Sequence, residues 1–185
     1  MIRRLFLLLA LLALPLAAAA QSVTQAQPDD WQTVVAPDLR CRLEMPSPVN
    51  KGEPEAKEKG QAGERIAWES KRDGNIYDFD YVDYDPNWFT GHDTKAMAKE
   101  LGRGDAEKAF PKDRYKYVRD EPITLQGWDG YALDIESEDG GTVMMRTYIV
   151  KDRLYRMLAT AKPDEKSKSA AIRFVDSLKL AETKQ

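Results

Sequence analysis

Residues 115–161 read YKYVRDEPITLQGWDGYALDIESEDGGTVMMRTYIVKDRLYRMLATA, and this stretch decides the fold. Its hydrophobic side chains alternate with polar ones: Tyr131, Leu133 and Ile135 fall on one side of an extended chain, Asp134 and Glu136 on the other. Such alternation is typical of strands with one buried face and one partly wet face. Gln-Gly, Asp-Gly-Gly and Lys-Asp turns divide the stretch into strands at 115–125, 128–138, 142–151 and 153–161. It therefore predicts an antiparallel meander, and it contains no catalytic motif.

The N-terminus has the features of a secretory signal peptide. Arg3 and Arg4 precede an apolar run at 5–16, and small residues follow up to Ala20. The run is shorter than the ~20 apolar residues of a membrane-spanning helix. We therefore expect cleavage after Ala20, export to the periplasm or secretion, and no transmembrane anchor after cleavage. Residues 21–30 are expected to form a flexible tether, and residues 31–181 a single domain.

The composition limits the classes of partner. The chain has 185 residues and a formal net charge of −3, and loss of the signal peptide makes it more acidic. Such a domain has no electrostatic reason to bind nucleic acid or anionic lipid. Its one cysteine, Cys41, excludes an internal disulfide. Alternation groups Cys41 with Leu39, Leu43 and Met45, so we expect a buried, inert thiol.

The first half of the chain is expected to add further strands, at 31–35, 39–45, 64–70 and 75–84. The intervening residues 46–63 contain Pro, Gly, Lys and Glu and predict a solvated loop without an aromatic anchor. In the last of these strands, Tyr77, Phe79 and Tyr81 share one face. The alternation slips at Val82, which predicts a β-bulge or the end of the strand there.

Two helices complete the pattern. Asp93 or Thr94 is expected to cap a helix over 95–110, where Gly102 and Gly104 each cost about 1 kcal/mol and predict a bend or break. A second helix follows position 164, with apolar residues at i, i+3, i+4 and i+7, and then a short strand at 178–180 and a frayed end. The order of elements predicts an α+β fold, with an antiparallel sheet of about six to seven strands covered by helices.

Several stretches resemble the PsbP-like family of bacterial exported proteins. They are DLRCRLEMP at 38–46, YVDYDP at 81–86, RDEPITLQG at 119–127, MRTYIVKDRLY at 145–155 and FVDSLKL at 174–180. The resemblance spans nearly all of the chain after residue 20 and implies an α-β-α sandwich around an antiparallel sheet. Cys41 stands where an aromatic residue is common, and the Gly102–Gly104 helix is unusual. Family members that share this fold do unrelated jobs, so the resemblance does not define a function.

An acidic stretch suggests a cation site. Its carboxylates, Asp83, Asp85 and Asp93, stand near His92, and hard divalent cations take clustered oxygen ligands. The stretch lacks the glycine and the terminal glutamate of an EF-hand loop. The alternative interpretation is that these acids keep the protein soluble or protect a sheet edge. We expect no cofactor other than such a cation.

Catalytic constellations are missing from the sequence. His92 is the only histidine and Cys41 the only thiol, and no G-x-S-x-G or H-E-x-x-H motif occurs. Nucleophilic catalysis needs a base in contact with the nucleophile and a third group to orient that base. We therefore expect a protein that is not an enzyme.

Aromatic residues gather where the strand ends and the first helix begins. Tyr84, Trp88 and Phe89, with Asp83, Asp85 and His92, form the candidate ligand or partner surface. The alternative is that the aromatic residues are buried under the helix. The sequence predicts a non-catalytic exported module that binds another envelope protein or a ligand. The alternative function is a cation or small-ligand binder that uses Asp83, Asp85 and His92.

Overall fold

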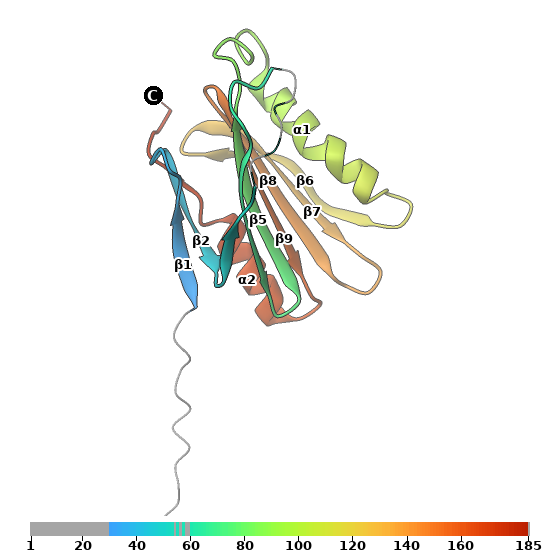
Figure 1. Ribbon diagram of the computed structural model, residues 1–185. Helices are drawn as coiled ribbons and strands as arrows, with labels where there is room; N and C mark the ends of the chain where they lie inside the picture. Colours follow the sequence, from blue (N-terminus) through green and yellow to red (C-terminus); the bar gives the residue numbers. More distant parts are fainter. Residues whose placement is uncertain (1–29, 54, 56, 58–59, 185) are drawn as a thin grey trace, which may run out of the picture.

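The computed structural model describes residues 30–53, 55, 57 and 60–184, which form ten strands and two helices (Figure 1). The elements are β1 (Trp31–Val35), β2 (Cys41–Pro46), β3 (Val49–Lys51), β4 (Ile66–Arg72), β5 (Asn75–Asp83), α1 (Thr94–Ala109), β6 (Lys116–Leu125), β7 (Trp128–Glu136), β8 (Thr142–Val150), β9 (Arg153–Ala161), α2 (Glu165–Val175) and β10 (Lys179–Leu180). The predicted signal peptide and the predicted tether up to residue 29 lie outside the described residues. Neither described helix is long and apolar enough to cross a membrane.

The strands form two antiparallel sheets. The large sheet has seven strands in the order β3-β4-β5-β9-β8-β7-β6, and the small sheet has the order β1-β2-β10. The meander predicted for residues 115–161 is β6 to β9, paired as successive hairpins. In the turn between β6 and β7, Gln126 and Gly127 have φ angles of 50° and 86°, as a two-residue hairpin turn requires. The predicted α+β fold is confirmed.

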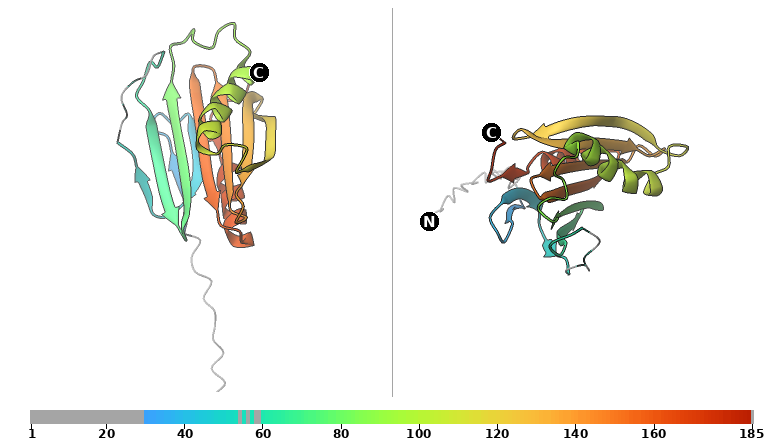
Figure 2. Two further views of the ribbon diagram at one scale, coloured as in Figure 1. Left: turned by 90° about the vertical axis from the view of Figure 1, so that its right-hand side faces the viewer. Right: turned by 90° about the horizontal axis from the view of Figure 1, so that it is seen from above.

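The large sheet is covered on both faces. Helix α1 packs on one face, where Ala98 contacts the cluster around Tyr131 and Ile149. Helix α2 and the small sheet pack on the other face (Figure 2). There, Phe174 meets Tyr77 edge to face. The expectation of one partly wet face holds for Val143 and Met145 of β8 and for alternate residues of β9 from Arg156 on, but it is wrong for residues 146–150 and 153–155, which are buried on both faces.

The predicted bulge at Val82 is also absent from β5. The strand pairs with β9 in unbroken register up to Asp83, where it ends as expected. Val82 is buried beside Phe89 on the α1 face. The apparent slip in alternation therefore reflects burial on both faces. The large sheet has its register shift in β6 instead, between Tyr117 and Arg119.

Helix α1 is continuous, so the predicted break is wrong. Asp93 is the N-cap, and its side chain accepts hydrogen bonds from the backbone N–H groups of Lys95 and Ala96. Gly102 faces β8 so closely that an added Cβ would lie 3.0 Å from Oγ1 of Thr147. The glycine lets the helix approach the sheet, and packing compensates for its low helix propensity.

Residues 46–63 are not a free loop where the structure describes them. β3 pairs with β4, and Gln61 forms a β-bridge with Tyr84. The ring of Trp88 lies directly over Gly60, where an added Cβ would be 2.4 Å from the ring. This segment has no aromatic residue of its own, and Trp88 packs against it instead.

Cys41 is buried as predicted, and so are Leu43 and Met45. Leu39 is not: its side chain is 72% exposed, and its φ is 61°. The strand begins only at Cys41, so Leu39 belongs to the turn after β1 and does not follow the strand alternation.

Candidate functional site

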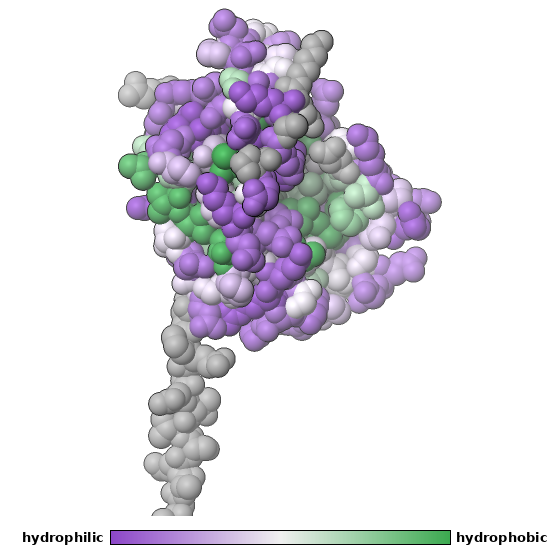
Figure 3. All heavy atoms as spheres, viewed as in Figure 1, coloured by the Kyte–Doolittle hydropathy of each residue, from purple (hydrophilic) through white to green (hydrophobic). Residues whose placement is uncertain are grey.

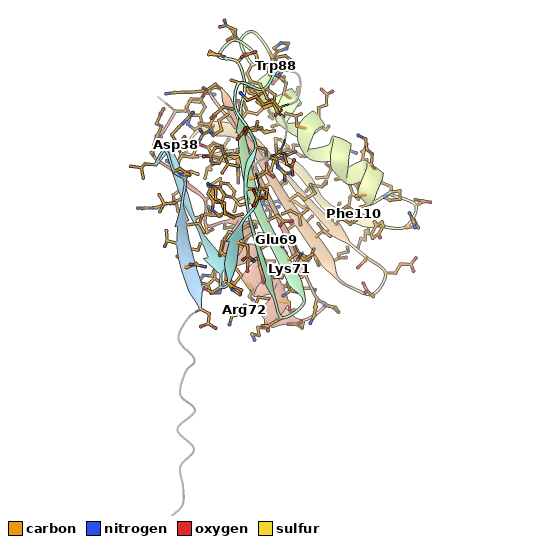
Figure 4. All side chains as sticks on the ribbon, viewed as in Figure 1. Asp38, Glu69, Lys71, Arg72, Trp88 and Phe110 are labelled. Carbon is orange, nitrogen blue, oxygen red and sulfur yellow. The ribbon has the colours of Figure 1, made fainter. Side chains whose placement is uncertain are left out.

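Asp83 lies in an ion-pair network and not in an open acidic cluster. Its carboxylate accepts hydrogen bonds from Nε and Nη2 of Arg153 at 2.6 and 2.7 Å, and from Nη1 of Arg40 at 3.4 Å. Arg153 also donates to Asp38 at 2.6 Å, and Arg40 to Asp152 at 2.9 Å. Figure 4 shows Asp38 at the tip of the small sheet. The network ties that tip to the large sheet.

The environment lowers the pKa of Asp38 and of Asp152, two acids of this network. Burial raises the pKa of Asp38, but the hydrogen bond and charge of Arg153 outweigh it, so the net pKa lies below the ordinary value. Burial also raises the pKa of Asp152, but the hydrogen bond from Arg40 lowers it more, so the net pKa lies below the ordinary value. Arg153 itself is only 2% exposed, and its guanidinium carbon lies 3.9 Å from the centroid of the Tyr81 ring. The contacts of Arg153 with Asp83, Asp38 and Tyr81 therefore hold the two sheets together.

The predicted cation ligands do not converge. Asp85 and His92 are exposed in the loop after β5, and the Asp93 carboxylate caps α1. Within the described residues, no three His, Cys, Asp or Glu side chains are grouped so that they could hold a metal ion. The predicted cation site is therefore not assembled, because Asp83 binds arginines and Asp93 caps α1.

The predicted aromatic surface divides into two parts. The Tyr84 ring stacks on Trp88 at 5.8 Å and meets Phe89 edge to face at 5.0 Å. Phe89 is 6% exposed and belongs to the core under α1, whereas Trp88 is 38% exposed at the tip of the loop (Figure 4). The two residues are not exposed together.

A cavity of about 510 Å³ has Phe89 in its wall. It is bounded by the loop after β5, the start of β7, the turn between β8 and β9, and the C-terminal tail. Apolar side chains make up part of its wall, with two threonine hydroxyls and three charged residues. The lining residues are Pro86, Phe89, Thr90, Thr94, Trp128, Ile149, Lys151, Asp152 and Lys184.

Hydrogen bonds fix the walls of this cavity. Oγ1 of Thr94 donates to Oδ2 of Asp129 at 2.6 Å, which joins the start of α1 to β7. Nε2 of Gln126 donates to the Leu180 carbonyl at 3.0 Å, and the Lys184 N–H donates to the Gln126 carbonyl at 3.0 Å. The expectation that the chain frays after residue 180 is therefore wrong up to Lys184, because the hairpin turn holds the tail in place.

The charges around the cavity are compensated, whereas a buried donor atom of the wall residue Trp128 has no partner. Lys184 lies 3.6 Å from Asp129, Lys151 pairs with Glu182, and Asp152 pairs with Arg40. Nε1 of Trp128 is buried and has no hydrogen-bond acceptor among the described residues. Buried donors are usually paired, so this indole is unusual.

Of the predicted residues, only Phe89 lines the cavity; Trp128 and Lys184 were missed. A usable signal was present in the sequence. In a meander, alternate turns lie at the same end of the sheet, so the turns at 126–127 and 151–152 were expected at one end. A tryptophan immediately after such a turn was therefore a candidate.

Comparisons with known proteins bear on the fold. No family model matches the sequence, and no curated protein matches it. Among solved structures, cyanobacterial PsbP (CyanoP) from Synechocystis sp. PCC 6803 is similar, with a TM-score of 0.57 and 10% identity over 87% of this chain and 98% of that chain. LpqN, described as involved in cell envelope biogenesis of Mycobacterium tuberculosis, gives a TM-score of 0.44 and 15% identity over 82% and 91%. The likeness to CyanoP confirms the fold expected from the sequence resemblance: this chain is an α+β protein with a PsbP-like fold.

Proposed function

We propose that this chain is a non-catalytic, exported binding module whose ligand enters the cavity beside Phe89 and Trp128. Export to the periplasm is inferred from the basic start, the apolar run and the small residues before Ala20. The binding role is inferred from the cavity itself. The ligand is a free small molecule or a side chain presented by another envelope protein.

The observation that carries the proposal is a cavity that has Phe89 and Trp128 in its wall and whose charged groups are all paired. A volume of about 510 Å³ lies in the range of small-molecule sites, which are mostly apolar with a few placed polar groups. Phe89, Trp128 and Ile149 supply the apolar contacts.

The compensated charges favour a ligand without net charge. Lys151, Asp152 and Lys184 each have a partner of opposite charge, so none offers an unpaired charge to the cavity. A charged ligand would have to break one of these pairs. The chemical class we propose is therefore a neutral molecule or side chain with an apolar body.

Two features support a non-catalytic role. His92 is exposed in the loop before α1, whereas Cys41 is buried in the core beneath the small sheet. Burial raises the pKa of the Cys41 thiol to about 12, so the thiol stays protonated near neutral pH and is a weak nucleophile. The alternative of a cation binder at Asp83, Asp85 and His92 is less well supported, because Asp83 is held by Arg153.

The test is native mass spectrometry of the chain after incubation with periplasmic extract. Thr90→Trp places a large ring at the cavity mouth. His92→Trp is the matched control, since His92 is exposed in the same loop and does not line the cavity. We expect wild type and His92→Trp to retain the same added mass and Thr90→Trp to lose it. Retention by all three proteins, or by none, would refute the proposal.

A further inference from the structure

Two cations face each other on the outer side of the small sheet. Lys179 of β10 is the direct cross-strand partner of Arg42 of β2. Val35 of β1 pairs with Arg42 from the other side, so the three side chains form one row across the sheet. Like charges placed directly opposite each other destabilise an antiparallel pair.

Neither cation has an anionic partner in the part of the chain that the structure describes. Glu44, the nearest acid along β2, is held by Nε of Arg173 at 2.8 Å. No hydrogen bond or ion pair involves the side chain of Arg42 or of Lys179 among the described residues. This contrasts with the cavity beside Trp128, whose charged groups are all paired.

Exposed apolar side chains adjoin the two cations. Leu39 is 72% exposed and Val35 is 48% exposed, and both lie at the tip of the small sheet. Figure 3 shows hydrophobic surface on this side of the molecule. Leu39 also has a φ of 61°, a conformation that favours glycine or asparagine over leucine. An exposed leucine in this conformation gives the folded chain no packing in return.

One cavity brings these features together. It has a volume of about 320 Å³ and is lined by Val35, Leu39, Leu180, Ala181, Arg42 and Lys179, with Cys41 at its base. Apolar residues and two unpaired cations line it, and no carboxylate does. The volume is at the lower end of the range for small-molecule sites, so it fits a small group or one part of a larger ligand.

We propose that this cavity binds an amphiphilic anion, in which a carboxylate or phosphate group lies between Arg42 and Lys179 and an apolar chain lies over Val35 and Leu39. The anion would remove the repulsion between the two cations, and guanidinium groups bind carboxylate and phosphate oxygens with two parallel hydrogen bonds. The apolar chain would cover the exposed leucine. The site is separate from the cavity of the proposed function.

Calorimetric titration of the purified mature chain at low ionic strength tests the site. The probes are decanoate below its micellar concentration, decanol with the same chain and no charge, and inorganic phosphate with no chain. We expect decanoate to bind at least about tenfold more tightly than either of the others, because only decanoate meets both halves of the site. Absence of decanoate binding, or equal affinity for decanol, would overturn the proposal.

Two variants separate the roles of the residues. Arg42→Gln/Lys179→Gln should weaken decanoate at least about tenfold, whereas Lys95→Gln/Lys99→Gln on exposed positions of α1 should leave it unchanged. Leu39→Asn suits the backbone conformation and should weaken decanoate while leaving phosphate binding unchanged. An equal loss of decanoate affinity in the two double variants would contradict a specific anion site.

Sedimentation with vesicles of phosphatidylcholine containing phosphatidylglycerol identifies the source of the anion. Binding that disappears in Arg42→Gln/Lys179→Gln assigns the anion to lipid headgroups. Decanoate binding without vesicle binding assigns it to a free amphiphile. Vesicle binding that the double variant retains, without decanoate binding, would refute the site.

Discussion

Arg153 donates to both carboxylate oxygens of Asp83, from Nε at 2.6 Å and from Nη2 at 2.7 Å. Asp83 ends β5 and Arg153 begins β9, and the two residues are register partners. Because Arg153 also binds Asp38 in the turn after β1, the same guanidinium joins the two sheets. The acid that most resembled a cation ligand in the sequence is therefore part of the structure that holds the sheets together.

Asp83→Asn should lower the free energy of unfolding by about 1–3 kcal/mol, since the buried guanidinium of Arg153 loses one of its two anionic partners. Asp38 still faces Arg153 and limits the loss. Urea denaturation measures the effect. Asp85→Asn, at an exposed position two residues further on, should stay within about 0.5 kcal/mol of wild type. Equal stability of both variants would show that the pair contributes little.

The two glycines of α1 should respond differently to alanine. Gly104→Ala should stabilise the protein by about 0.5–1 kcal/mol, because nothing lies within 4 Å of the added Cβ. Gly102→Ala should bring no gain or a loss, because its Cβ would lie 3.0 Å from Oγ1 of Thr147. Thermal denaturation distinguishes the two, and Gly102→Ala/Thr147→Ala should recover part of the gain. A similar gain from each single variant would contradict the close approach of helix and sheet.

Asp78 should make stability depend on pH. Burial, and then the charges of Glu69 and Asp80, raise the pKa of Asp78 to about 6 from an ordinary value of 3.8. The folded chain thus holds this proton more tightly than the unfolded chain, so the stabilisation is complete below about pH 4 and is lost as the pH rises to about 6. Asp78→Asn should be about 1–3 kcal/mol more stable than wild type at pH 7.5 and similar to it at pH 4.

Urea denaturation at both pH values checks this dependence. Asp113→Asn, which changes an exposed acid, should show no difference between pH 4 and pH 7.5 relative to wild type. A stabilisation by Asp78→Asn that is the same at both pH values would mean that the charge of Asp78 is not its cause.

Cys41 should resist alkylation. The thiol is 2% exposed, and burial raises its pKa to about 12. Iodoacetamide at pH 8 should therefore modify the folded chain at least about 100-fold more slowly than the chain in urea, as mass spectrometry can follow. Cys41→Ser/Thr33→Cys supplies an exposed thiol as the control. Rapid labelling of Cys41 in the folded chain would contradict a buried, inert thiol.

Local signals in the sequence explain why most elements could be predicted. Asp93 and Asp164 were recognisable as helix caps, and turns such as Gln126-Gly127 marked the hairpins. The burial of both sheet faces could not be read in this way. In the sequence, the charged residues Arg146 and Asp134 suggest a face exposed to solvent. In the structure, Nη1 of Arg146 donates to Asp134 at 2.6 Å, and this pairing allows both residues to be largely buried.

The candidate site was only partly predictable for a related reason. Phe89 was identified because it lies within the aromatic stretch. Trp128 follows the turn at Gln126, and Lys184 belongs to the C-terminal tail that hydrogen bonds hold against this turn, so both line the cavity although they are far from Phe89 in the sequence. Contacts of this kind depend on which strand ends meet in space. They are determined by the order of the strands, which alternation within each strand does not specify.

The most direct test of the binding role is the indole Nε1–H resonance of Trp128 in ¹H–¹⁵N correlation spectra. The chain has four tryptophans, and Trp128→Phe assigns the signal. On addition of periplasmic extract, we predict that the Trp128 resonance shifts while that of Trp68, which is buried in the main core, does not. An unchanged Trp128 resonance, with or without a shift at Trp88, would contradict a ligand site in this cavity.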